Sequence, residues 1–381
     1  MKTPLLAALG AAVVLVSPVA LAQKTAPKAA TPAPAPTPVA GVTVATPAVV
    51  PPNARPAPIE DLRFVGDQPQ RQDPYEFERH GVAAAQAGEL GRARDLFQKS
   101  WDVAELPTAA FNLACVDVRE GKKDAAFKQL DRAVGVGLDD ERLLMTDTDL
   151  APIRDDPRFA TILASARKNR ADGDAAVVKE GIFVAPTGAP RAILLLLHDA
   201  SSDPLTVSGP FTDAARQRGL FVAAPRGPAR AGRKRFGWGS TERAFAAVDA
   251  AVEEARRRAG ALPVIVVGLG RGGALAYTLA SRRPAGIVAA GSVGGPFDPN
   301  ATAAAPGAQN PVAAMKRMRL FLGVQSEAPT TIVSAFRRGR DLLNQAGLQP
   351  VYKEWPGTGT GLPADAAKAV KEILDSLTGA G

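Results

Sequence analysis

The segment LPVIVVGLGRGGALAYTLA, which runs from Leu262 to Ala280, indicates the fold more clearly than any other part of the chain. It begins with an apolar run typical of a buried strand, continues through closely spaced glycines and ends in a helical pattern with a small-residue face. A strand, a sharp turn at Gly270 and a helix are therefore expected in direct succession. Glycine suits such a strained turn because it has no Cβ.

Strands and helices alternate on both sides of this segment. The expected strands after Val178 are 181–185, 192–197, 220–224, 264–267, 286–290, 319–324 and 350–355. The 242–258 stretch places apolar residues on one helical face and arginines on the other, as in a helix that covers a sheet. This alternation favours a largely parallel, doubly wound sheet with helices on both faces. We expect one α/β domain over 178–381.

An internal repeat precedes the α/β region, because two helical segments superpose at an offset of 33 residues. The residues on matching packing positions are Phe77, Gly81, Gly88, Ala93, Phe97 and Ser100 in the first copy and Ala110, Ala114, Gly121, Ala126, Leu130 and Ala133 in the second. The segments resemble tetratricopeptide repeats, and 138–168 resembles the cap that closes a short array. The resemblance implies a helical domain over 59–170 that binds a protein partner. A short linker is expected at 171–175.

Residues 1–58 carry no pattern of a folded domain. Residues 1–22 are typical of a secretory signal peptide, with Lys2, an apolar run and a small-residue cleavage site. Residues 23–58 contain ten prolines among alanine, threonine and valine, and we expect them to form a disordered linker. The mature chain should begin at Gln23 and be periplasmic or secreted. No other stretch is long and apolar enough to span a membrane.

The formal net charge of +8 is unevenly distributed. Residues 59–177 carry 17 basic and 23 acidic groups, whereas 178–381 carries 25 basic and 15 acidic ones. Docking of the acidic module on the basic one is therefore an alternative to an external partner. The arginine clusters, of which 226–243 is the largest, are read first as solvated faces, with an anionic envelope component as the external alternative. Nucleic acid is not expected for an exported protein. The single cysteine, Cys115, excludes an intramolecular disulfide.

The α/β region resembles α/β-hydrolases, especially carboxylesterase, phospholipase and feruloyl-esterase-like members. The resemblance covers 178–381 and rests on ILLLLHDASSD, FVAAPRGPARAG…FGWGS, VIVVGLGRGG and VYKEWPGTGTG in that order. It implies a nucleophile elbow, G-x-S-x-G, whose serine position is Gly270. Glycine can form this turn but cannot attack a carbonyl.

The other members of the implied triad are missing as well. The resemblance places the catalytic histidine on the 355–363 loop, but the chain has only His80, at a packing position of the first repeat, and His198. His198 matches the family's structural histidine, and Glu327 is the candidate relic acid. Asp199, at the oxyanion hole, would repel an oxyanion. We therefore predict a catalytically defective domain that binds or scaffolds, with no metal and no cofactor.

Two other functions stay open. An esterase with a rearranged site would need a nearby serine, with His198 as its base. The candidate serines are Ser201, Ser202, Ser240 and Ser292. A nucleotide-binding module is the second alternative, because Gly268, Gly270 and Gly273 spell G-x-G-x-x-G between a strand and a helix. The acidic residue expected about 20 positions after such a fingerprint is absent.

The vacated site leads to three structural expectations. Gly270→Ser should be tolerated, whereas Gly272 and Gly273 should resist larger side chains because helix and strand pack closely there. Arg271, at the helix start, should either pair with Asp199 and close the site or turn outward and form an anion pocket with helix N–H groups. Closure is favoured, since an arginine would offset the desolvation of Asp199.

Overall fold

The computed structural model describes residues 74–282, 285–296 and 313–379. All of them belong to one compact unit, which spans Pro58–Gly381. The expected signal peptide and proline-rich linker lie outside the described residues. In the part of the chain that is described, no helix is both long enough and apolar enough to cross a membrane.

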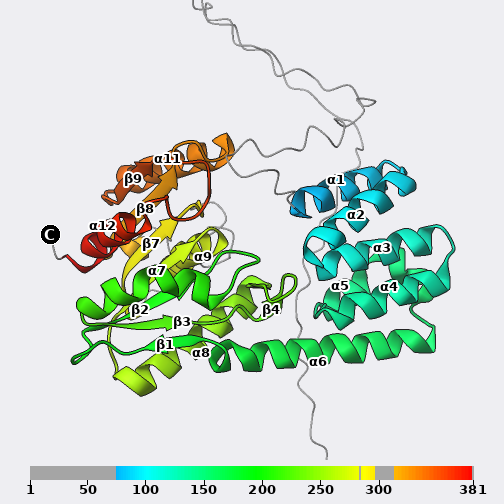
Figure 1. The fold of residues 1–381 in the computed structure, drawn as a ribbon, viewed down its shortest axis with the longest axis horizontal. Coiled ribbons are helices and arrows are strands. Elements are labelled where there is room, and N and C mark those ends of the chain that lie inside the picture. The colour runs from blue at the N-terminus through cyan, green and yellow to red at the C-terminus, as the bar shows by residue number, and fades with distance from the viewer. Residues whose placement is uncertain (1–73, 283–284, 297–312, 380–381) are drawn as a thin grey trace, which may run out of the picture. The chain divides into compact units, whose positions relative to one another are not determined.

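The first described segment is helical (Figure 1). Its elements are α1 (Pro74–Gln86), α2 (Leu90–Ala104), α3 (Pro107–Arg119), α4 (Lys123–Gly135), α5 (Glu141–Thr146), the 3-10 helix η2 (Thr148–Ile153) and α6 (Pro157–Lys179). Helix α1 packs on α2 and α3 packs on α4, so the chain forms successive helical hairpins. Small residues allow this packing: a Cβ on Gly81 would lie 2.5 Å from the ring of Phe97.

The expected linker at 171–175 is wrong, because these residues lie inside α6, a continuous helix of 23 residues. Gly173 lowers helix propensity. A Cβ at this position, however, would lie 2.2 Å from the carbonyl oxygen of Pro228. Glycine therefore serves close packing at this point and does not end the helix.

Within the described residues, seven strands form the central sheet in the order β1-β3-β2-β6-β7-β8-β9. They are β1 (Ile182–Val184), β2 (Ala192–Leu197), β3 (Leu220–Ala224), β6 (Val264–Leu269), β7 (Ile287–Val293), β8 (Arg319–Gln325) and β9 (Val351–Trp355). Every neighbouring pair is parallel except β1 with β3. The predicted mostly parallel sheet is confirmed. A separate hairpin is formed by β4 (Ala229–Arg230) and β5 (Phe236–Gly237).

Helices cover both faces of the sheet (Figure 1). Their bounds are α7 (Pro204–Gln217), α8 (Thr241–Ala259), α9 (Arg271–Arg282), the 3-10 helix η3 (Ala313–Met315), α11 (Thr330–Gln345) and α12 (Ala366–Thr378). Alternate side chains of β2 enter two cores: Ile193 and Leu195 pack with α8, α9 and α11, whereas Leu194 and Leu196 pack with α7 and α12. All of β2 and β6 is buried, as expected for parallel strands covered on both sides.

Candidate functional site

The candidate site lies at the carboxyl edge of the sheet, where β2, β6 and β7 end side by side. Strand β2 leads into His198, β6 into Gly270 and β7 into Gly294. Ligand sites of open α/β sheets occur at this edge, because loops from neighbouring parallel strands meet there. The fold therefore brings the expected site residues His198, Asp199, Gly270 and Arg271 together.

Gly270 forms the sharp turn between β6 and α9. Its φ of +51° lies in the left-handed region, and its carbonyl accepts the N–H of Gly273 at 2.9 Å. A Cβ on Gly272 would lie 2.2 Å from the carbonyl oxygen of Leu197, and one on Gly273 would lie 2.3 Å from Ser292 Oγ. The predicted strand, turn and helix are confirmed. The predicted intolerance of Gly272 and Gly273 to larger side chains agrees with these distances.

The carboxylate of Asp199 fills the space in front of Gly270. A Cβ at position 270 would lie 2.0 Å from Asp199 Cγ and 2.1 and 2.2 Å from the two carboxylate oxygens. Asp199 Oδ1 accepts the backbone N–H of Ala200 at 2.6 Å and that of Arg271 at 2.7 Å. Burial raises the pKa of the Asp199 carboxyl, and these two hydrogen bonds offset part of that shift. Asp199 therefore occupies the place where a nucleophile at position 270 would project.

The tolerance of Gly270→Ser stays a prediction, and the distances argue against it, because a Cβ at this position would force the Asp199 carboxylate to move. The expected ion pair between Arg271 and Asp199 is wrong. The side chain of Arg271 is exposed, and among the described residues its guanidinium forms no ion pair with Asp199; the backbone N–H of Arg271 binds the carboxylate instead. Closure by an Arg271 guanidinium, the favoured expectation, is therefore not observed. The N-terminus of α9, whose N–H groups and dipole stabilise an anion, binds the carboxylate instead.

His198 is fully buried, and both of its ring nitrogens are engaged. The N–H of Gly227 donates to Nε2 at 2.8 Å, so the proton lies on Nδ1, which donates to the Asp199 carbonyl at 2.7 Å. The ring stacks on Trp238 with centroids 4.7 Å apart, and the indole N–H donates to the His198 carbonyl at 2.9 Å. Burial lowers the pKa of His198 to about 4. The neutral ring orients the loop, and its Nε2 is not free to take a proton from a serine.

The candidate replacement serines have other roles. Ser201 and Ser292 each donate to a backbone carbonyl. Ser240 caps the N-terminus of α8, and Ser202 pairs with β5 through its backbone. Within the described ranges, none of these hydroxyls is hydrogen-bonded to an imidazole. A serine without a neighbouring base is a weak nucleophile at neutral pH.

Gln325, the last residue of β8, fastens the loop on which the resemblance places a catalytic histidine. Its Nε2 donates to the carbonyls of Gly361 and Leu362 at 3.1 Å, and its Oε1 accepts the N–H of Gly359 at 3.1 Å. Glu327, the candidate relic acid, is exposed. Gln325 was not predicted as a site residue; the available signal was a polar residue at the end of an otherwise apolar strand.

The G-x-G-x-x-G turn is closely packed against other parts of the protein. A Cβ on Gly268 would lie 2.0 Å from the carbonyl oxygen of Gly272. The Asp199 carboxylate also takes the N-terminus of α9, where a pyrophosphate would bind in a dinucleotide site. A phosphate would have to displace this carboxylate, so the geometry disfavours the nucleotide alternative.

Cys115, Asp147 and Asp149 bring three potential metal-ligand atoms within 4.8 Å of one another in the helical segment. Burial raises the pKa of the Cys115 thiol far above its usual range, so the sulfur is a neutral thiol at neutral pH. Asp147 also accepts the N–H of Asp149 as a cap of η2. These contacts suit a structural role. His80 lies on α1 with Nε2 3.9 Å from a Glu76 carboxylate oxygen and does not belong to this group.

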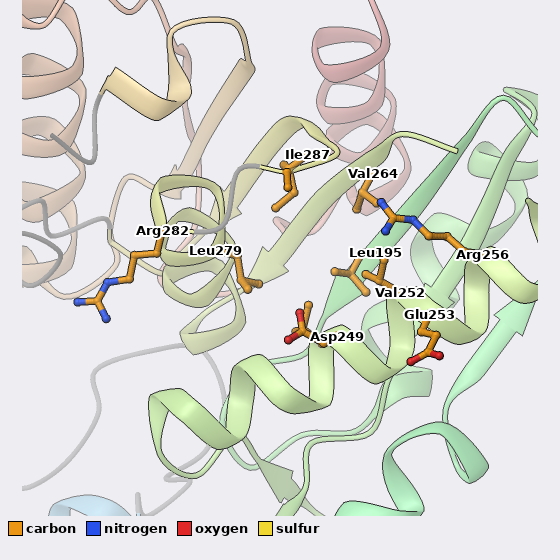
Figure 2. Close-up of a pocket in the computed structure, with 11 residues that line it drawn as sticks. Leu195, Asp249, Val252, Glu253, Arg256, Val264, Leu279, Arg282 and Ile287 are labelled. Atoms are coloured by element: carbon orange, nitrogen blue, oxygen red, sulfur yellow. The ribbon is translucent and has the colours of Figure 1, made fainter. Parts of the chain in front are cut away.

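A pocket of about 810 Å³ lies toward the opposite end of the strands (Figure 2). Val264 and Ile287, the first residues of β6 and β7, line it, and Asp249, Glu253 and Arg256 approach it from α8. None of the expected site residues is among its lining residues. This pocket and the candidate site are therefore separate.

No family model matches the chain, and no curated protein matches it. Solved structures with partial similarity include an uncharacterized protein from Bacillus cereus, with 9% identity and a TM-score of 0.44, covering 81% of this chain and 100% of that one. Esterase PE8 has 17% identity and a TM-score of 0.43, covering 52% and 98%. A monoacylglycerol lipase from Paleococcus ferrophilus has 16% identity and a TM-score of 0.40, covering 53% and 100%. Similarity at this level carries no conclusion about activity.

Proposed function

We propose that this chain joins a tetratricopeptide-like interaction module to an α/β-hydrolase-like domain that has lost turnover and acts in binding or scaffolding. The observation that carries the proposal is the position of Asp199. Its carboxylate takes the space of a nucleophile side chain at Gly270 and accepts hydrogen bonds from Ala200 and Arg271. In the family that the sequence resembles, the N–H after the nucleophile stabilises the oxyanion of the substrate.

The groups that remain at this site are expected to contribute little to acyl transfer. Loss of nucleophile and base lowers such a rate by about six powers of ten. The remaining contribution would come from donors to the oxyanion, and here the Arg271 N–H is bound to an internal carboxylate. His198 supplies no base, because both of its ring nitrogens are hydrogen-bonded in the core.

The experiment is an assay of short acyl esters together with covalent labelling by a fluorophosphonate. We expect ester hydrolysis at the rate of buffer and no labelled serine. His198→Ala and Ser201→Ala serve as comparison variants. Turnover well above buffer that either substitution abolishes would refute the proposal and favour an esterase with a rearranged site.

We propose a protein partner for the helical segment. The support is the repeat spacing of the sequence and the successive hairpins α1–α2 and α3–α4. An anionic envelope component is a weaker candidate, because arginines of the 226–243 cluster pair within the chain. A photo-crosslinking residue at exposed Val82 should capture one protein in cells, whereas the same residue at exposed Val288 of the sheet should not. Equal capture at both positions would contradict this assignment.

We also propose that the protein is exported, on the strength of the signal-like pattern in residues 1–22. N-terminal sequencing of the protein purified from its native cells should identify Gln23 as the first residue. An intact Met1 in the mature protein would contradict export by this signal.

A further inference from the structure

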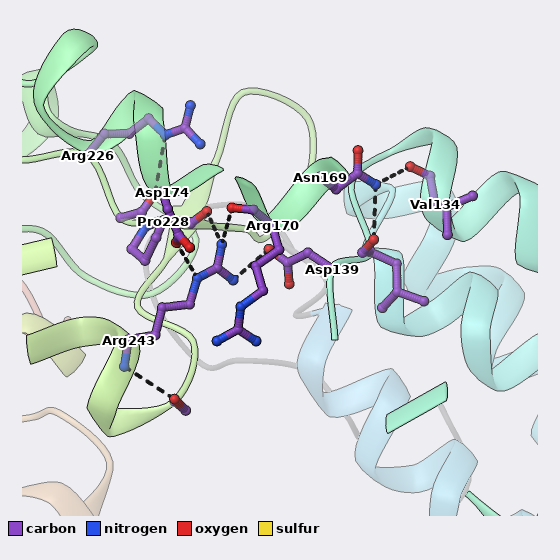
Figure 3. Close-up of polar contacts among 11 residues, drawn as sticks. Val134, Asp139, Asn169, Arg170, Asp174, Arg226, Pro228 and Arg243 are labelled. Atoms are coloured by element: carbon purple, nitrogen blue, oxygen red, sulfur yellow. Dashed lines mark hydrogen bonds and ion pairs between the residues drawn. The ribbon is translucent and has the colours of Figure 1, made fainter. Parts of the chain in front are cut away.

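Arg243, near the start of α8, is almost fully buried although it carries a charge. Its guanidinium reaches two carboxylates and two carbonyls (Figure 3). The acceptors are Asp174 Oδ1 at 2.7 Å, Asp139 Oδ2 at 2.7 Å, the Pro228 carbonyl at 3.1 Å and the Arg170 carbonyl at 3.3 Å. A buried guanidinium is stable only when its charge is paired and its N–H groups are hydrogen-bonded. The four acceptors fulfil both conditions.

These acceptors belong to different parts of the chain. Asp139 precedes α5, and Asp174 lies on α6, so both come from the helical segment. Pro228 leads into β4, and Arg243 itself belongs to the helix that covers the sheet. One side chain therefore joins the helical segment to the sheet domain by two ion pairs, of which the one with Asp139 is largely buried and the one with Asp174 is partly open to water.

Two glycines between the helical segment and the β4–β5 hairpin also leave no room for a side chain. A Cβ on Gly137 would lie 2.4 Å from Arg230 Cγ, and one on Gly232 would lie 2.6 Å from the Ala104 carbonyl oxygen. Both glycines have a positive φ, +104° and +117°. Together with Gly173, they make a contact that depends on shape as well as charge, so the ion pairs of Arg243 are held in one geometry.

We infer that Arg243 couples the helical segment, residues 74–179, to the sheet domain, so that the two unfold in one cooperative step. The acidic module then docks on the basic one within the chain, in addition to the partner proposed to bind at exposed Val82 of α1. At the rim of the same contact, Arg233 binds Glu105 at 2.6 and 3.0 Å. This pair is exposed and contributes little, because water screens it.

Hydrogen exchange of the full chain across a urea series tests this inference. In the wild-type protein, amides of α3 and of β6 should lose protection at the same urea concentration. In Arg243→Met, Asp139 and Asp174 lose their partner, so protection of α3 should be lost at a urea midpoint lower by on the order of 1 M than that of β6. Arg257→Met is the matched control, since Arg257 lies on the same helix, is exposed and, among the described residues, pairs with Glu254 alone.

Three outcomes decide the matter. Separate midpoints in Arg243→Met and coincident midpoints in Arg257→Met support the coupling. Two separate midpoints in the wild-type protein, or coincident midpoints in Arg243→Met, overturn it. If Arg243→Met does not fold, Arg243→Lys replaces it, because lysine keeps the charge but cannot reach four acceptors; coincident midpoints in that variant also overturn the inference.

Discussion

Replacement of Gly270 by serine would restore the elbow motif, yet we expect it to destabilise the protein. The new Cβ would lie 2.0 Å from Asp199 Cγ, so the Asp199 carboxylate would have to leave its place. It would give up the N–H groups of Ala200 and Arg271. Hydrogen bonds to a charged group are worth about 1.5–3 kcal/mol each. Serine at a φ of +51° costs about 1–2 kcal/mol more.

Solvation of the displaced carboxylate offsets part of this loss, because burial disfavours its charged form at present. The free energy of unfolding of Gly270→Ser should therefore fall by about 3–5 kcal/mol. Urea denaturation followed by tryptophan fluorescence measures it. Gly347→Ser isolates the backbone effect, since Gly347 has a φ of +78° and a Cβ added there would meet no atom within 4 Å. That variant should lose only about 1–2 kcal/mol.

The double variant Asp199→Gly/Gly270→Ser supplies the decisive comparison. Removal of the carboxylate makes room for the serine, so the double variant should recover at least about 2 kcal/mol relative to Gly270→Ser. It should still lack esterase activity, because His198 remains engaged and no other base is supplied. Wild-type stability of Gly270→Ser, or no recovery in the double variant, would refute the role assigned to Asp199.

Three further predictions concern individual contacts. The free energy of unfolding should fall by up to about 3 kcal/mol as the pH falls from about 6.5 to about 4, because the unfolded chain binds a proton that buried His198 excludes; urea curves of His198→Gln should lack this component. Gln325→Ala should speed amide exchange in the 357–362 loop while β2 keeps its protection, since three hydrogen bonds to the loop are lost; unchanged exchange would argue against this fastening. Gly272→Val should abolish soluble folded protein, because its Cβ would lie 2.2 Å from the Leu197 carbonyl oxygen, and a folded variant with the wild-type urea midpoint would contradict that packing.

The sequence alone predicted the strands of the central sheet and the α/β class, although it placed a linker where α6 continues. Apolar runs such as 192–197 and 264–267 predicted buried strands, and the glycines after the second run predicted the turn, because both signals are local and depend on residues that are neighbours in the chain. The absence of a serine at position 270 and of a histidine on the 355–363 loop can be read from the sequence directly. The engaged histidine at position 198 was also expected, as a structural residue.

Only the tertiary structure decided which atoms meet across the sheet edge. Asp199 and Arg271 are 72 positions apart, and charge alone favoured an ion pair between their side chains. The fold instead places the start of α9 against the end of β2. The backbone N–H of Arg271 therefore binds the carboxylate, and the Arg271 guanidinium is exposed to water. The same holds for Arg243 and Asp139, which lie 104 positions apart. Such contacts depend on how whole elements pack, and local sequence patterns carry no information about contacts between residues so far apart in the chain.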